Sequence, residues 1–131
     1  MNKKMIQKLM QYVDFDHISK YEELSREFIQ CFQDKLCWTL LSRHQDFSLS
    51  FIREFQDKVD WERISYSQDL SEDFIREFKD DVNWSSISYH QDLSEAFIRE
   101  FEDKVNWSWI LSSQDLSEDF KKEFEDREFQ I

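Results

Sequence analysis

The sequence repeats with a period of 23 residues. The phrase DLSEDFIREF at 69–78 returns as DLSEAFIREF at 92–101 and as DLSEDFKKEF at 115–124. The same step separates four tryptophans, Trp38, Trp61, Trp84 and Trp107. A fixed period in this range is typical of proteins that stack one supersecondary unit many times. We therefore expect units that are adjacent in the sequence to be adjacent in space.

This spacing divides the chain into five units, at residues 13–35, 36–58, 59–81, 82–104 and 105–127. Residues 1–12 match the second half of a unit, because Met5 stands one period before Phe28. Residues 128–131 form a tail in which the pattern ends. Stacked units need caps that keep their open ends soluble. We expect the whole chain to form a single repeat domain with a capping segment at each end.

Each unit contains the start signals of two short helices. In the third unit, VDWERISYSQDLSEDFIREFKD, Asp60 is a good N-cap for a helix that begins at Trp61. Ser71 repeats this signal before a second helix, whose first residues, Glu72 and Asp73, suit the positive end of the helix dipole. The glutamines just before the second helices are predicted to bond backbone groups in the turn. They are Gln45, Gln68, Gln91 and Gln114.

Such short helices need neighbours, because isolated helices below about 12–15 residues are marginal in water. Each unit offers seven apolar positions at helical spacing, which in the third unit are Val59, Trp61, Ile64, Leu70, Phe74, Ile75 and Phe78. Only adjacent units can cover them. A leucine-rich repeat has a similar period, but its strand signature is missing here. We predict an all-α fold, a right-handed-type α-solenoid of five helix-turn-helix repeats.

Composition narrows the possible functions. The chain has no Gly and no Pro, so Gly-rich phosphate loops are excluded. No apolar run is long enough for a membrane span or a signal peptide, and we expect a cytoplasmic protein that does not bind membranes. Cys31 and Cys37 are too few for a disulfide framework and are expected to be free thiols.

We find no catalytic constellation and expect neither an enzyme nor a cofactor. His44 and His90 occupy one column two units apart, and with helix layers about 8–10 Å thick a single metal ion cannot join them. His17 lies in another column. No Ser, Cys or carboxylate stands at a spacing that would use these histidines, so we expect them on the surface.

Carboxylates form two columns along the repeats. One contains Glu54, Glu77, Glu100 and Glu123, and the other contains Asp57, Asp80, Asp103 and Asp126. The glutamates stand beside Arg53, Arg76, Arg99 and Lys122, which favours ion pairs between units on a solvated face. The formal net charge of −12 argues against direct binding to nucleic acid and favours a partner with a basic surface. Alternatively, these columns imitate the charge of nucleic acid.

The units differ most in the first helix, where positions not needed for stacking change at every step. Tyr, Trp and Arg dominate the energetics of protein interfaces. We therefore predict a partner-binding face that contains Arg43, Tyr66, Tyr89, His90 and Trp109. For Trp109 we favour a second interpretation, in which Trp109 and Leu111 cover the terminal core together with Phe129 and Ile131.

The repeated motif resembles tandem repeats of large DNA viruses and phages. It reads WERISYSQDLSEDFIREF in the third unit and WSSISYHQDLSEAFIREF in the fourth, and the resemblance covers residues 13–124. It implies a helical array of viral or phage origin, located in the host cytoplasm, and it carries over no enzymatic activity. We expect a non-catalytic protein-interaction module. The alternative is an acidic inhibitor that occupies the nucleic-acid site of a host defence nuclease or DNA-binding protein.

Overall fold

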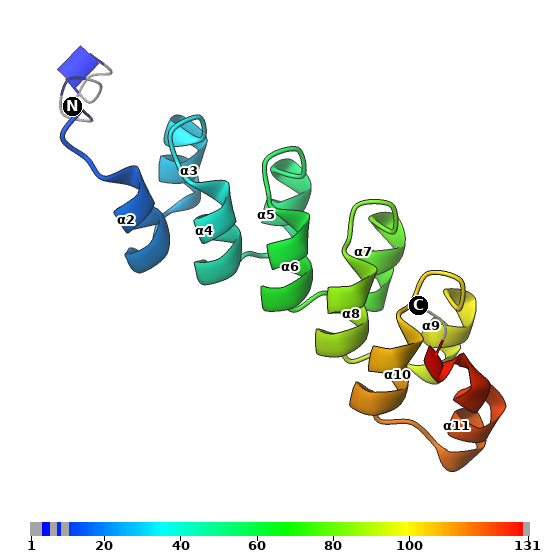
Figure 1. Cartoon of the computed structure of the whole chain (residues 1–131). Coiled ribbons are helices and arrows are strands. Elements are labelled where there is room, and N and C mark those ends of the chain that lie inside the picture. The colour runs from blue at the N-terminus through cyan, green and yellow to red at the C-terminus, as the bar shows by residue number, and fades with distance from the viewer. Residues whose placement is uncertain (1–3, 6–7, 9–10, 130–131) are drawn as a thin grey trace.

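The protein is an elongated array of helix pairs (Figure 1). The structure is a computed structural model that describes residues 4–5, 8 and 11–129, and it contains no strand in this part of the chain. The predicted N-terminal cap at 1–12 and the predicted tail at 128–131 fall largely outside the described residues. The all-helical repeat fold predicted from the sequence is confirmed.

Every unit contributes two helices of six or seven residues. The first helices are α2 (Phe15–Tyr21), α4 (Trp38–His44), α6 (Trp61–Ser67), α8 (Trp84–His90) and α10 (Trp107–Ser113). The second helices are α3 (Arg26–Phe32), α5 (Leu49–Glu54), α7 (Glu72–Glu77), α9 (Glu95–Glu100) and α11 (Glu118–Phe124). A 3-10 helix, η1 (Glu125–Phe129), follows α11.

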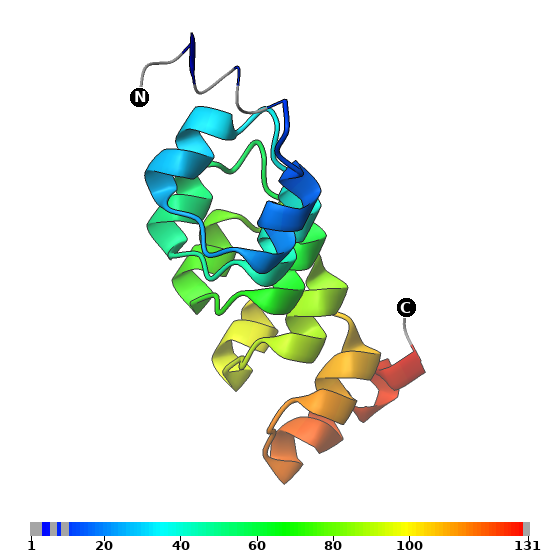
Figure 2. The ribbon, with the colours of Figure 1, turned by 90° about the vertical axis from the view of Figure 1, so that its left-hand side faces the viewer.

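The first helices form a continuous row, in which α2 packs on α4, α4 on α6, α6 on α8 and α8 on α10. The second helices line the other side of the array, as the two views in Figures 1 and 2 show together. After the fifth unit, η1 packs on α10 and on α11. It therefore covers the face of α10 on which another first helix would otherwise stack.

The predicted caps start the helices. Asp60 accepts a hydrogen bond from the backbone N–H of Arg63, and Ser71 accepts one from that of Phe74. The equivalent serines, Ser25, Ser48, Ser94 and Ser117, cap the other second helices in the same way. Cys37 stands at a first-helix cap without a side-chain hydrogen bond, and it is a free thiol like Cys31.

The apolar columns close into one core that runs the length of the array. Ile64, Phe74 and Ile75 are fully buried in the third unit, as predicted. Trp61 is only partly buried, because its indole lies at the edge of the core and its Nε1 donates to the carbonyl of Gln56 at 3.1 Å. The same tryptophan bond recurs in the second, fourth and fifth units.

A column of small buried residues allows the first helices to approach closely. Its members are Ser19, Ser42, Ser65 and Ser88, and each has no exposed surface. The hydroxyl of Ser65 donates to the carbonyl of Trp61 at 2.7 Å and accepts the backbone N–H of Asn83, in the next unit, at 3.0 Å. Leu111 replaces serine in the fifth unit. Serine is thus present where another first helix follows.

The glutamines bond backbone groups, as predicted, but they do so between units. Gln91 Oε1 accepts the N–H of Leu70, while its Nε2 donates to the carbonyls of Ser65 and Gln68. These carbonyls lie at the C-terminal end of α6, where a helix leaves its last groups unsatisfied. Glycine in a left-handed conformation often ends helices in other proteins. No described residue here has a positive φ. The glutamine of the next unit takes the place of such a glycine.

Candidate partner-binding surface

Four aromatic side chains from three successive first helices form a continuous row on the surface. We call Tyr66, His90, Tyr89 and Trp109 the aromatic row. The ring centroids of Tyr66 and His90 are 3.7 Å apart, those of His90 and Tyr89 4.4 Å, and those of Tyr89 and Trp109 4.5 Å. All three pairs meet edge to face. The structure thus brings together four of the five residues predicted for partner binding.

The aromatic row borders a pocket of about 270 Å³, which Ser85 and Ser86 of α8 also line. The rings stay accessible, since Tyr66 is 54% exposed, Tyr89 45% and Trp109 41%. His90 is half-buried, and its Nε2 is shielded from solvent without a hydrogen-bond partner in the described structure. The pocket therefore offers mainly the surface of these rings.

Trp109 belongs to the aromatic row rather than to the end of the core. Its ring contacts Tyr89 of the preceding unit, and it is exposed, whereas Trp107 on the same helix is 3% exposed and packs on Phe120 and Phe124. The alternative prediction, in which Trp109 packs with Phe129 and Ile131, involves side chains outside the described residues. Leu111 packs against the core, as that alternative proposed for it.

The row continues toward the N-terminus as a strip of cations. Arg43 occupies in the second unit the position that Tyr66 occupies in the third, and Lys20 occupies it in the first. Arg63 occupies the position of Ser86 one unit earlier. Partial burial, followed by the charges of Arg43 and Lys20, lowers the pKa of His44 below its usual value. Lys20 and Arg43 therefore lie near the same imidazole.

These cations have no carboxylate partner in the part of the chain that the structure describes. We call Lys20, Arg43 and Arg63 the basic strip. Lys20 lies over the ring of Tyr21, at 5.0 Å from its centroid, and none of the three forms an ion pair. The sequence analysis placed Arg43 on the partner-binding face but did not single out Lys20 and Arg63 as a group.

The arginines on the second helices, by contrast, contact carboxylates of the next unit. Arg53 pairs with Glu77 of the next unit at 3.0 Å, Arg76 pairs with Glu100 at 2.9 Å, and Arg99 pairs with Glu123. Arg26 in the same way contacts Glu54. The three arginines that follow Arg26 also lie over Phe rings of the next unit, Phe74, Phe97 and Phe120. The predicted pairing between units is confirmed for Arg53, Arg76 and Arg99 but not for Lys122, which forms no ion pair with a described residue, and the glutamate column is largely neutralised.

A third acidic column, which the sequence analysis did not single out, is free of ion pairs. Its members lie in the turns between first and second helices and are exposed: Glu23, Asp46, Asp69, Asp92 and Asp115. None of them has a side-chain hydrogen bond or ion pair in the described structure. In the predicted aspartate column, by contrast, Lys104 lies 4.0 Å from Asp80. The sequence shows an acidic residue in every turn between a first and a second helix. It does not show that these carboxylates lack an ion-pair partner.

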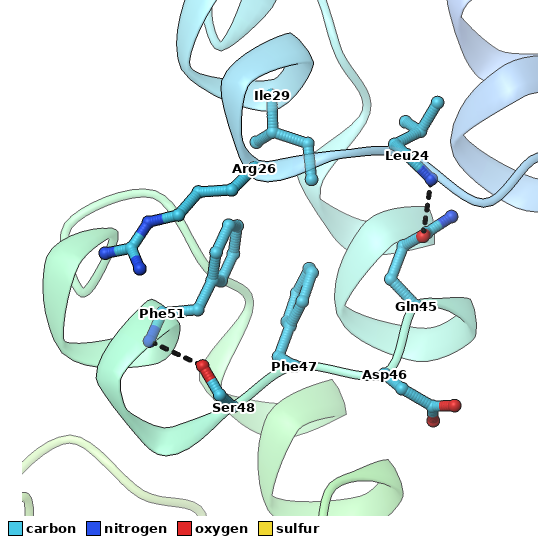
Figure 3. Close-up of a pocket in the computed structure, with 8 residues that line it drawn as sticks. All are labelled: Leu24, Arg26, Ile29, Gln45, Asp46, Phe47, Ser48 and Phe51. Carbon is cyan, nitrogen blue, oxygen red and sulfur yellow. Dashed lines mark hydrogen bonds between the residues drawn. The ribbon is translucent and has the colours of Figure 1, made fainter.

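A second hollow, of about 240 Å³, lies between the second helices of the first and second units (Figure 3). Gln45 accepts the N–H of Leu24 and Ser48 accepts that of Phe51. Arg26, at its edge, contacts Glu54. Among these polar side chains only Asp46, a member of the unpaired column in the turns, is not engaged, and we interpret the hollow as a seam between units.

The described residues contain no other chemical site. No group of three His, Cys, Asp or Glu side chains among them is placed to hold a metal ion. His17 packs on Tyr21 at 4.8 Å, away from the aromatic row. None of the helices in the described part of the chain has both the length and the apolar character that a membrane span requires.

The packing and the repeated contacts define an α-helical repeat solenoid. No family model matches the chain, and neither a curated protein nor a solved structure is detectably similar to it.

Proposed function

We propose that this solenoid is a non-catalytic protein-interaction module and that the first helices carry its binding face. The observation that supports this function best is the aromatic row, which crosses three units and stays exposed. Tyr and Trp are enriched among the residues that contribute most to binding energy. The resemblance of the repeats favours a viral or phage origin and action in the host cytoplasm.

The positions on this face lie outside the contacts that recur in every unit, although their rings touch one another. The core columns, the buried serines and the glutamines hold the units together, and they recur with little change. The aromatic row differs from unit to unit and contributes nothing to those contacts. Repeat proteins commonly bind partners along such an extended surface.

The test is a pull-down from host-cell lysate with the parent protein and with the Tyr66→Ala/Tyr89→Ala variant. Tyr12→Ala is the control, because Tyr12 is 81% exposed and lies before α2, outside the aromatic row. We expect the double variant to lose partners that the parent and the control retain. Recovery of the same partners by all three proteins, at the same yield, would exclude this face.

A second function, inhibition of a host defence nuclease or DNA-binding protein by charge mimicry, is favoured by the unpaired column in the turns. Glu54, Glu77 and Glu100 are poor candidates for such a surface, because arginines of the preceding units neutralise them. Asp69 and Asp92 are better ones. Mimicry predicts binding that weakens steeply with added salt and that Asp69→Asn/Asp92→Asn removes. Binding through the aromatic row would tolerate Asp69→Asn/Asp92→Asn, so this variant separates the two functions.

A further inference from the structure

We propose that the partner reaches the first helices with an acidic segment, whose carboxylates lie on the basic strip and whose aromatic side chain enters the pocket beside the aromatic row. This inference rests on the proposed interaction function and adds the chemistry of the ligand. It differs from the expectation that the net charge supports, which is a partner with a basic surface.

The first argument for an acidic partner is that the cations of the basic strip have no carboxylate partner in the described structure. The chain has 17 Lys and Arg against 29 Asp and Glu, so carboxylates are in excess and a cation could easily be given a partner. Arg53, Arg76 and Arg99 on the second helices each have one. The basic strip has none. Unpaired cations gathered on one face of an acidic protein are suited to carboxylates that come from outside, and arginine binds carboxylates in a bidentate fork.

The repeat places the strip and the pocket on one continuous surface. Tyr66 and Ser86 line the pocket between α6 and α8. One unit earlier, between α4 and α6, the equivalent positions hold Arg43 and Arg63. Because α4, α6 and α8 pack directly on one another, an extended segment that lies along the first helices passes from one site to the next.

The pocket suits one aromatic side chain. Its volume of about 270 Å³ is below the range of about 300–1,000 Å³ that is usual for sites of whole small molecules. Tyr89 and Trp109 offer ring surface against which an incoming ring can pack. His90 also lines the pocket, but its Nε2 is shielded from solvent, so the ring surfaces supply the contact.

The remaining charges disfavour a nucleic acid as the occupant. A strand long enough to follow the first helices would carry many phosphates past a protein of net charge −12 and past the unpaired Asp46, Asp69 and Asp92 in the turns. Long-range repulsion acts on all of those phosphates. A short protein segment presents a few carboxylates to the basic strip and avoids most of the repulsion.

The experiment is a selection from a random-peptide display library on the immobilised full chain, with Tyr66→Ala/Tyr89→Ala as a parallel target. We expect the peptides that are enriched on the parent alone to be acidic and to contain Trp or Tyr. Enrichment of Lys- and Arg-rich peptides would overturn this inference and leave the interaction function standing. Identical enrichment on parent and variant, or none on either, would contradict the interaction function itself.

Two further variants distinguish direct binding of carboxylates by the basic strip from the long-range effect of the protein's net charge. Arg43→Gln/Arg63→Gln should weaken the best selected peptide about tenfold or more, which corresponds to about 1.4 kcal/mol per factor of ten. Lys35→Gln/Lys79→Gln removes the same charge from the loops that follow second helices and should change affinity less than threefold or so. Equal losses in both variants would overturn the inference. A fluorescent oligothymidine that binds the parent better than the selected peptide would overturn it as well.

Discussion

The side chain of Gln91 caps a helix that belongs to the preceding unit, since its Nε2 donates to the carbonyl of Gln68 at 2.7 Å. Gln68 does the same for Gln45 at 2.6 Å, and Gln114 for Gln91 at 2.7 Å. Each first helix that is followed by another one, from α2 to α8, is therefore completed by a glutamine 23 positions beyond its C-cap residue. Stability is shared between neighbours rather than held within a unit, and this explains how helices of six or seven residues persist.

The first prediction concerns this glutamine. Gln91→Leu leaves the N–H of Leu70 and two carbonyls without partners inside the protein, so it should reduce the free energy of unfolding by about 2–4 kcal/mol. Gln56→Leu is the control, because Gln56 is exposed and bonds only the carbonyl of Arg53 in its own turn. Urea unfolding followed by circular dichroism measures both. Equal losses would mean that the bonds between units are unimportant.

The second prediction concerns the buried serine. Ser65→Ala deletes the acceptor for the N–H of Asn83 and should cost about 1–2 kcal/mol. Ser65→Leu also forces side-chain volume between α6 and α8 and should cost about 3 kcal/mol or more. Ser112→Ala is the matched control, since that hydroxyl is exposed and bonds only carbonyls of its own helix. A Ser65→Leu variant as stable as the parent would contradict the close packing of the first helices.

The third prediction concerns pH. The hydrogen bond from Arg26 holds the pKa of Glu54 below its ordinary value of 4.5, and partial burial opposes this only in part. A carboxyl whose pKa is lower in the folded state stabilises the fold above its unfolded pKa, and this stabilisation is lost as the pH falls through the folded pKa. The parent should thus be more stable than Glu54→Gln at neutral pH, and the difference should shrink as the pH falls below 4.5 and disappear once the pH is below the folded-state pKa of Glu54.

Unfolding midpoints in urea across this pH range measure that difference. Glu27→Gln serves as the charge-matched control, because Glu27 is exposed on α3 and has no ion pair in the described structure. A gap between parent and Glu54→Gln that is the same at pH 7 and at low pH would show that the ionised form of Glu54 is not stabilised in the folded state.

The fourth prediction concerns modularity. Deletion of residues 59–81 removes one whole period and joins two units that carry the same contact residues. The shortened chain should fold with an unchanged helical signal per residue and with a lower total stability, because each unit adds one interface. Deletion of residues 59–70 removes half a period and should abolish cooperative unfolding. A half-period deletion that folds as well as the full-period one would refute the stacking scheme.

The sequence predicted the architecture because one period contains all of its local signals. Asp60 and Ser71 mark two helix starts, and the apolar columns mark the faces that must be covered. The period does not reveal which position of one unit meets which position of the next. Arg53 pairs with Glu77, which is 24 residues away, and Ser65 accepts the N–H of Asn83, 18 residues away.

The same limit applies to the binding face. Sequence variation pointed to Tyr66, Tyr89, His90 and Trp109, and the structure joins them in one row. Their rings meet because neighbouring first helices are offset, so that non-equivalent positions of adjacent units come into contact. A comparison of equivalent positions in the sequence does not reveal this offset. The absence of ion pairs on the basic strip was equally hidden, because every unit has carboxylates nearby in the sequence and only geometry decides which of them reach a cation.

The placement of η1 on α10 has a consequence for assembly. A surface that binds a copy of itself head to tail generates open fibres when the rotation does not close into a ring. At this end of the protein the complementary surface is already covered by the chain's own 3-10 helix, and Leu111 lacks the hydroxyl that would accept an incoming backbone N–H. We therefore expect this end of the array to disfavour the head-to-tail addition of a second molecule.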